Sequence, residues 1–318
     1  MLVAGFAFSA LAAIVSFVAT ALVLRQARQS STIGAAGSPL AGGLGIALGG
    51  VLVTLFVAYH APWPAALVLL VSLFAAGFGY LADRRALGRP WRLGVTALLL
   101  ALLIGLGIPL FLLRTETGIA LPAPVLLGIV VIGALGWISA FARMDRIAGL
   151  AASQAALMLS AAAALALFSG RASLDQPGLW WMVGLAAASG GFLVLAWPPA
   201  RLAMGRLGTS YLGLMLVFLA LNGIVLGWFD PQQALVLGAV PIALATADLL
   251  PVQRAAPAIL RTDKRRMTAW FLASLLVLLP LAGLAGLGGP WTFLAPALAL
   301  LATLALALWM GRPPAAPQ

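Results

Sequence analysis

The sequence has no cysteine, a single histidine and few charged side chains. The lack of cysteine excludes disulfide bonds and thiolate metal sites. Charged residues make up 8% of the 318 residues, whereas a soluble domain carries roughly 25%. Hydrophobic residues make up 64%. This composition indicates an integral membrane protein and excludes an ordinary soluble enzyme.

Long apolar runs account for most of the chain. A membrane-crossing helix needs about 20 mainly apolar residues, and this criterion predicts eleven spans. They are 2–24, 40–60, 65–81, 93–113, 123–142, 147–168, 179–197, 208–228, 234–251, 267–287 and 291–310. No room is left for a soluble domain, so we predict one all-α polytopic transmembrane domain over 1–318. The Pro/Ala-rich tail, 311–318, is expected to be disordered.

The net charge of +11 is distributed unevenly between the predicted loops. If the N-terminus lies outside, sixteen of the eighteen Lys and Arg residues lie on cytoplasmic loops or the C-terminal tail, and only Arg114 and Arg171 lie outside. The positive-inside rule therefore predicts an outer N-terminus and a cytoplasmic C-terminus. Topology explains the basic excess, with attraction to anionic lipid as a second effect. We expect no nucleic-acid partner.

Four predicted cytoplasmic segments, taken in order, carry a shared pattern. They are 37–43 (GSPLAGG), 79–85 (GYLADRR), 139–151 (SAFARMDRIAGLA) and 196–213 (AWPPARLAMGRLGTSYLG). They resemble motifs of the polyprenyl-phosphate N-acetylhexosamine-1-phosphate transferases, glycosyltransferase family 4, which includes the bacterial translocase I enzymes. The resemblance implies a helical bundle in the bacterial inner membrane. It also implies a nucleotide sugar and a polyprenyl phosphate as substrates, and Mg²⁺ as the cofactor of active members.

The sequence departs from the family pattern at the chemical positions. The adjacent acidic pair is Ala82-Asp83, the second aspartate of the third segment is Ala148, and the metal-binding aspartate of the fourth is Arg206. Family asparagines are replaced by Ser139, Ala142 and Ala196, and the late loop at 261–266 has no histidine. His60 lies at the predicted outer end of its span, where an interfacial role is expected.

The resemblance nevertheless implies roles for particular residues. Asp83 and Asp145 are the remaining acidic positions of the catalytic site. Alternatively, Asp83 is a solvated loop charge or a helix cap, and Asp145 is a salt-bridged loop residue. The expected substrate-binding residues are Ser38, Arg201, Arg206, Lys264 and Arg265, and no metal ligands are assigned. We hypothesise that Arg206, helped by Arg143 or Arg146, replaces the metal ion with an internal ion pair. Asp248, near the cytoplasmic end of the ninth span, is either functional or paired with Arg254.

Three functions stay open on the sequence alone. The first is a catalytically degenerate member that acts as a scaffold, a lipid-phosphate binder or the partner of an active paralogue, with no cofactor. The second is an active transferase with a rearranged site that uses Mg²⁺. The third is a transporter or channel, against which the sequence shows no paired mid-membrane charges. The sugar, the lipid and any homo- or hetero-oligomer are not specified.

Overall fold

The computed structural model describes residues 1–29, 42–85, 87–108, 122–145, 147–197, 202–247 and 264–310. Within these ranges the regular structure is entirely helical. The helices are α1 (Leu2–Gln29), α2 (Gly43–His60), α3 (Pro62–Arg84), α4 (Arg89–Gly107), α6 (Ala123–Met144), α7 (Leu150–Phe168), α8 (Pro177–Ala196), α9 (Gly205–Val225), α10 (Pro231–Leu237), α11 (Ala239–Ala247), α12 (Lys264–Ala285) and α13 (Trp291–Met310). Ten of them are long and apolar enough to cross a membrane, which confirms the predicted multi-pass helical membrane protein.

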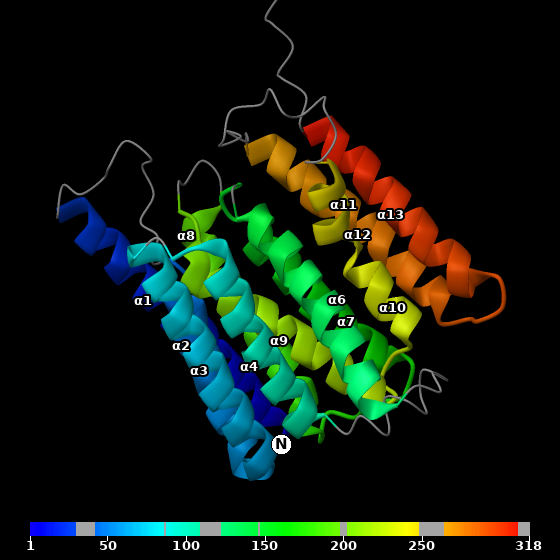
Figure 1. Ribbon diagram of the computed structural model, residues 1–318, viewed down its shortest axis with the longest axis horizontal. Coiled ribbons are helices and arrows are strands. Elements are labelled where there is room, and N and C mark those ends of the chain that lie inside the picture. Colours follow the sequence, from blue (N-terminus) through cyan, green and yellow to red (C-terminus); the bar gives the residue numbers. More distant parts are fainter. Residues whose placement is uncertain are drawn as a thin grey trace, which may run out of the picture.

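The long helices lie side by side in a bundle (Figure 1). Among the ten candidate spans, α7 and α9 have the largest share of buried residues, and α4 and α13 have the smallest. Helix α1 packs against α2 and α8, and α3 packs against α9. The hairpin of α12 and α13 reaches the rest of the bundle mainly through α10 and α11. The exposed leucines and phenylalanines on the outer helices are the surface that lipid covers in a membrane.

The predicted ninth span, 234–251, is not one continuous helix in the residues described. It consists of α10 and α11, which are separated at Gly238. Pro241 has no N–H to donate to the carbonyl of Leu237, and its ring would clash there. The carbonyl of Gly238 instead accepts a hydrogen bond of 3.1 Å from the indole Nε1 of Trp137 on α6. A proline and a tertiary contact therefore overrule the apolar pattern.

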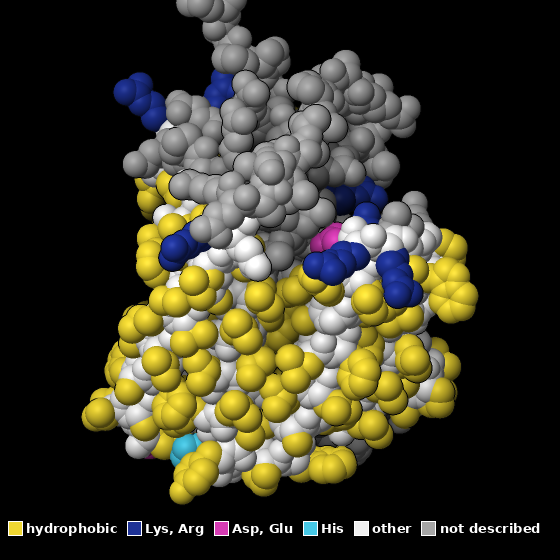
Figure 2. All heavy atoms as spheres, turned by 90° about the vertical axis from the view of Figure 1, so that its left-hand side faces the viewer, with side chains coloured by type: hydrophobic (Ala, Val, Ile, Leu, Met, Phe, Trp, Pro, Cys, Tyr) yellow, Lys and Arg dark blue, Asp and Glu magenta, His cyan; other side chains and the backbone are white. Residues whose placement is uncertain are grey.

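The two ends of the bundle differ in charge. Lys and Arg side chains gather at one end of the apolar surface, and the histidine lies at the other (Figure 2). The backbone N–H of Gly43, which begins α2, donates to the carbonyl of Met204 just before α9. Arg206 contacts the last turn of α3, so these helix ends meet at the same end as the arginines. We call this end of the bundle, which includes Arg84, Arg85 and Arg206, the basic end.

Two glycines allow this convergence. A Cβ atom at Gly43 would collide with the backbone of Gly208, and one at Gly79 would lie 2.5 Å from the carbonyl oxygen of Arg206. Helices α2 and α3 can therefore approach the first turn of α9 only because these positions lack side chains.

Candidate functional site at the first turn of α9

Asp145 binds the beginning of α9 with both carboxylate oxygens. It follows directly after α6, and the turn that leads from it to α7 passes through Gly149 with a φ of 77°. Its Oδ1 accepts the backbone N–H of Met204 at 2.9 Å, and its Oδ2 accepts the N–H of Gly205 at 2.8 Å. Because the first N–H groups of a helix have no partner within the helix, Asp145 acts as a cap supplied from another helix.

Asp83 binds the next residue of α9. Its Oδ2 accepts the backbone N–H of Arg206 at 2.8 Å, and its Oδ1 lies 3.5 Å from the Nε of the Arg206 guanidinium. The Nη1 of Arg206 donates to the carbonyl of Ala82 at 2.8 Å. The Asp83 side chain is 10% exposed and that of Arg206 is 43% exposed. Arg206 and the last turn of α3 are therefore joined through both backbone and side chain.

The local sequence explains why distant acids are needed here. The four residues from 202 to 205, Leu-Ala-Met-Gly, contain none of the Ser, Thr, Asp or Asn residues that usually cap a helix. The Met204 side chain makes no capping hydrogen bond. Three consecutive N–H groups, those of Met204, Gly205 and Arg206, receive their acceptors from α3 and from the residue after α6. The missing local cap is the sequence signal from which this role of Asp83 and Asp145 could have been found.

Burial strongly affects the carboxyl group of Asp145. Removal from water raises its pKa from 3.8 to about 7, and the nearby charge of Asp83 also raises it. The hydrogen bonds from Met204 and Gly205 lower the pKa, but by less. Asp145 thus titrates close to neutral pH, where its protonated form can still accept hydrogen bonds.

The oxygens at this site do not suit Mg²⁺. The ion takes about six oxygen ligands in octahedral geometry, commonly including one or two carboxylates. Here both oxygens of Asp145 face backbone N–H donors, and Asp83 faces a third N–H and a guanidinium. Two unit charges about 4 Å apart interact by roughly 4 kcal/mol at an effective dielectric constant near 20. The charge of Arg206 would therefore repel a divalent cation bound to Asp83.

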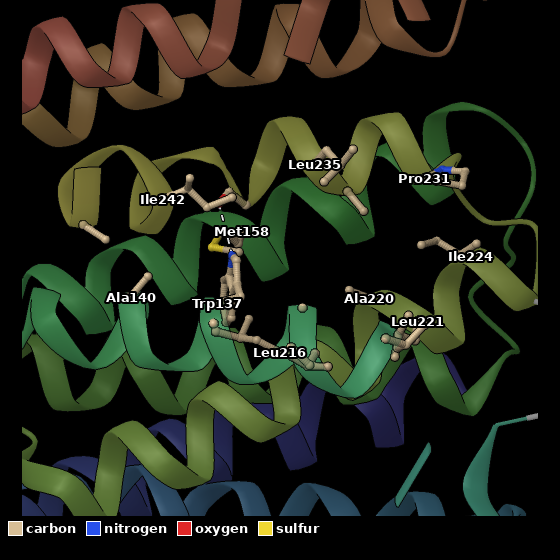
Figure 3. A pocket seen from close by; sticks show the side chains of 18 of the residues that line it. Trp137, Ala140, Met158, Leu216, Ala220, Leu221, Ile224, Pro231, Leu235 and Ile242 are labelled. Atoms are coloured by element: carbon tan, nitrogen blue, oxygen red, sulfur yellow. Dashed lines mark hydrogen bonds between the residues drawn. The ribbon is translucent and has the colours of Figure 1, made fainter. Parts of the chain in front are cut away.

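A cavity of about 790 Å³ lies between α6, α9, α10 and α11 (Figure 3). One end is lined by Ile224 and Pro231, and the other by Ala140, Arg143 and Thr246. The lining residues of α6 run from Leu126 to Arg143, a length of about 26 Å at 1.5 Å per residue. Its walls are almost entirely apolar, and Arg143 is the one charged residue among the described side chains that line it. The break between α10 and α11 forms part of the wall beside Trp137.

The structure brings together some of the predicted site residues. Asp83, Asp145 and Arg206 converge on α9, whereas Arg265 is exposed in the first turn of α12. No hydrogen bond or ion pair described for the chain joins Arg265 to those three. The remaining predicted positions, together with the Lys264 side chain, lie outside the described residues: Ser38, Arg146, Arg201, Asp248 and Arg254. His60 is exposed at the opposite end of the bundle.

The sequence comparisons agree with the motif pattern. Among curated proteins, no sequence matches the chain. The family model described as glycosyl transferase family 4 matches residues 65–224. This range contains the segments at 79–85, 139–151 and 196–213, and therefore both acids and Arg206. Since the match covers half of the sequence and includes the helices that form the site, the chain belongs to glycosyl transferase family 4.

Proposed function

We propose that this protein is a catalytically degenerate family member that binds a lipid phosphate, such as polyprenyl phosphate, in a bacterial inner membrane. The observation that carries the proposal is the use of Asp83 and Asp145. Their carboxylates accept the first N–H groups of α9, and Asp83 also faces Arg206. Acids that in a transferase would serve the metal and the substrates here stabilise a helix terminus.

The chemistry of sugar-phosphate transfer supports this interpretation. The reaction brings a nucleotide diphosphate and a lipid phosphate together, and their negative oxygens must be neutralised at the reacting centre. In the family pattern carboxylates hold the cation that does this. An arginine at one of those positions can bind an anion, but it cannot hold a metal ion. The observed site therefore favours binding of a phosphate over metal-assisted transfer.

The cavity supports a lipid as the bound molecule. A site of about 790 Å³ with apolar walls along most of α6 suits a hydrocarbon chain, since it offers almost no polar partner. Arg143 at the basic end of this cavity offers a positive charge for an anionic head group. Such a protein would act as a lipid-phosphate carrier or scaffold, alone or with an active transferase as partner.

The alternative is an active transferase with a rearranged site. It requires the Arg206 side chain to leave Asp83, although its guanidinium lies 3.5 Å from that carboxylate and donates to Ala82. A direct assay decides between the two. Purified protein is incubated with radiolabelled UDP-N-acetylhexosamine, undecaprenyl phosphate and Mg²⁺. We expect no release of UMP above a protein-free control, whereas release would overturn the proposal.

A variant that restores the acidic residues tests the same proposal through a gain of Mg²⁺ binding. The triple substitution Ala82→Asp, Ala148→Asp and Arg206→Asp restores the acids of the family pattern. We expect it to show a Mg²⁺-dependent rise in melting temperature that the unsubstituted protein lacks. The double variant Ala82→Asp, Ala148→Asp, which keeps Arg206, is the matched control and should respond less. A Mg²⁺ response in the unsubstituted protein would contradict the proposed role of Arg206.

A further inference from the structure

We infer that the Arg206 guanidinium is a built-in cation that binds one phosphate group without any metal ion. The inference deepens the proposed function and rests on it for the identity of the lipid. The inference is motivated by the poor fit of the site to Mg²⁺, because the position expected to help hold a divalent cation carries a fixed positive charge of its own.

The guanidinium is held in place but is not fully used. It has five N–H donors, of which one on Nη1 binds the carbonyl of Ala82 and the one on Nε faces Asp83. Among the contacts of the described residues, Nη2 has no protein partner, and the side chain is 43% exposed. An arginine that is already oriented loses little conformational entropy when it binds an anion. Its outer N–H groups match the oxygens of a phosphate, which guanidinium groups bind in a bidentate manner.

The surrounding charges favour an anion. Arg84 and Arg85 follow directly after Asp83, and Arg84 lies over the ring of Tyr80 with a distance of 4.6 Å to its centroid. Asp83 and Asp145 offset only part of this positive charge, because Arg143 and Arg206 lie at the same end as Arg84 and Arg85. The described side chains at the basic end therefore leave a surplus of positive charge, which raises the local concentration of anions.

The site is also linked to the cavity. Asp145 lies two residues after Arg143, which lines the basic end of the cavity, and it accepts the N–H of Gly205, the residue before Arg206. A phosphate at Arg206 would therefore lie at the same end of the bundle as the Arg143 end of the cavity. A lipid phosphate and free inorganic phosphate offer the same anion to the guanidinium. Only the lipid phosphate carries a hydrocarbon chain, and this difference distinguishes the two sources.

Calorimetric titration of the purified protein in detergent with EDTA tests the inference. The two probes are inorganic phosphate and dodecyl phosphate. We expect wild-type protein to bind in EDTA and added Mg²⁺ to leave the affinity unchanged. Arg206→Gln should weaken binding by about tenfold or more, the loss expected for a charge-assisted hydrogen bond. Arg171→Gln is the matched control. Arg171 is also ion-paired and 41% exposed, but its partner is Asp230, the N-cap residue of α10, at 3.2 Å.

Several outcomes would overturn the inference. They are no binding of either probe, binding that disappears in EDTA and returns with Mg²⁺, and an Arg206→Gln variant that binds as tightly as wild type. If Arg206→Gln fails to fold, Arg206→Lys keeps the charge and removes the planar donor set, so it should still bind more weakly than wild type. The EDTA comparison on wild-type protein needs no variant.

The source of the phosphate follows from the same titrations. Tighter binding of dodecyl phosphate than of inorganic phosphate identifies a lipid, and equal affinities identify free phosphate. Both results support a metal-independent anion site at Arg206. Failure of the proposed function would be detected by a different measurement, as UMP release in the transfer assay.

Discussion

Asp145 keeps its place in a family motif while both of its carboxylate oxygens accept backbone N–H groups at the beginning of α9. In the folded protein its pKa is raised to about 7 by burial, from an ordinary value of 3.8. The folded state therefore binds a proton more readily than the unfolded state between these two values. The contribution to stability is fully present below about pH 4 and is lost as the pH rises through 7.

The raised pKa of Asp145 leads to a measurable dependence of folding stability on pH. We expect the melting temperature of the purified protein to fall by several degrees between pH 5 and pH 8, since one pKa unit corresponds to about 1.4 kcal/mol. In Asp145→Asn the fall should be smaller, although the variant is less stable at every pH because its amide N–H₂ faces a backbone N–H. Asp230→Asn, at an exposed carboxylate, is the control and should keep the wild-type slope. An unchanged slope in Asp145→Asn would refute the assignment.

At the scale of secondary-structure elements, the interrupted pair α10 and α11 determines the shape of the cavity. Gln233 holds α10 in place with both polar atoms of its side-chain amide. Its Oε1 accepts the N–H of Asp230, and its Nε2 donates to the carbonyl of Ala282 on α12. The break at Gly238 is held by Trp137. These hydrogen bonds keep the two short helices in position beside α6, and a continuous helix would give the cavity a different wall.

Filling the cavity from α6 tests its role. Gly133 lines the cavity, and a Cβ atom there would meet nothing within 4 Å. We expect Gly133→Phe to fold and to retain several-fold less lipid phosphate after purification, as measured by mass spectrometry of extracted lipids. Gly128→Phe is the matched control on the same helix, because Gly128 also has open space but does not line the cavity. Equal lipid content in both variants would argue against the cavity as the binding site.

At the scale of the whole molecule, charge and packing place the site at one end of the bundle. Asp83, Asp145 and Arg206 lie at the basic end, and His60 lies at the opposite end (Figure 2). Together with the positive-inside rule, this arrangement predicts that the site faces the cytoplasm, where nucleotide sugars and soluble phosphates are found.

The absence of cysteine makes this orientation easy to measure. Tyr59 is 86% exposed beside His60, and Arg85 is exposed at the basic end. In intact cells a membrane-impermeant maleimide should label Tyr59→Cys, whereas Arg85→Cys should react only after permeabilisation. The unsubstituted chain should not be labelled in either condition. The reverse labelling pattern would place the site outside the cytoplasm and invert the predicted topology.

Ten spans were predictable from the sequence because lipid imposes a simple rule on every crossing helix. Backbone groups must be satisfied within the helix, so length and apolar content suffice. That rule failed at 234–251, where Pro241 leaves the carbonyl of Leu237 without its usual donor. Trp137, about 100 residues away in the chain, donates a hydrogen bond to the carbonyl of Gly238 at the break. A pairing at that separation has no periodic signature in the sequence.

The sequence by itself determined the membrane bundle, the family and the chemical departures, because each depends on residue type at a known position. Only the tertiary structure decided what Asp83, Asp145 and Arg206 contact. A carboxylate has the same letter in a sequence whether it binds a metal ion, a substrate or a helix terminus. Its role is set by which donors surround it, and here those donors are the N–H groups of Met204, which precedes α9, and of the first two residues of α9, together with a neighbouring guanidinium.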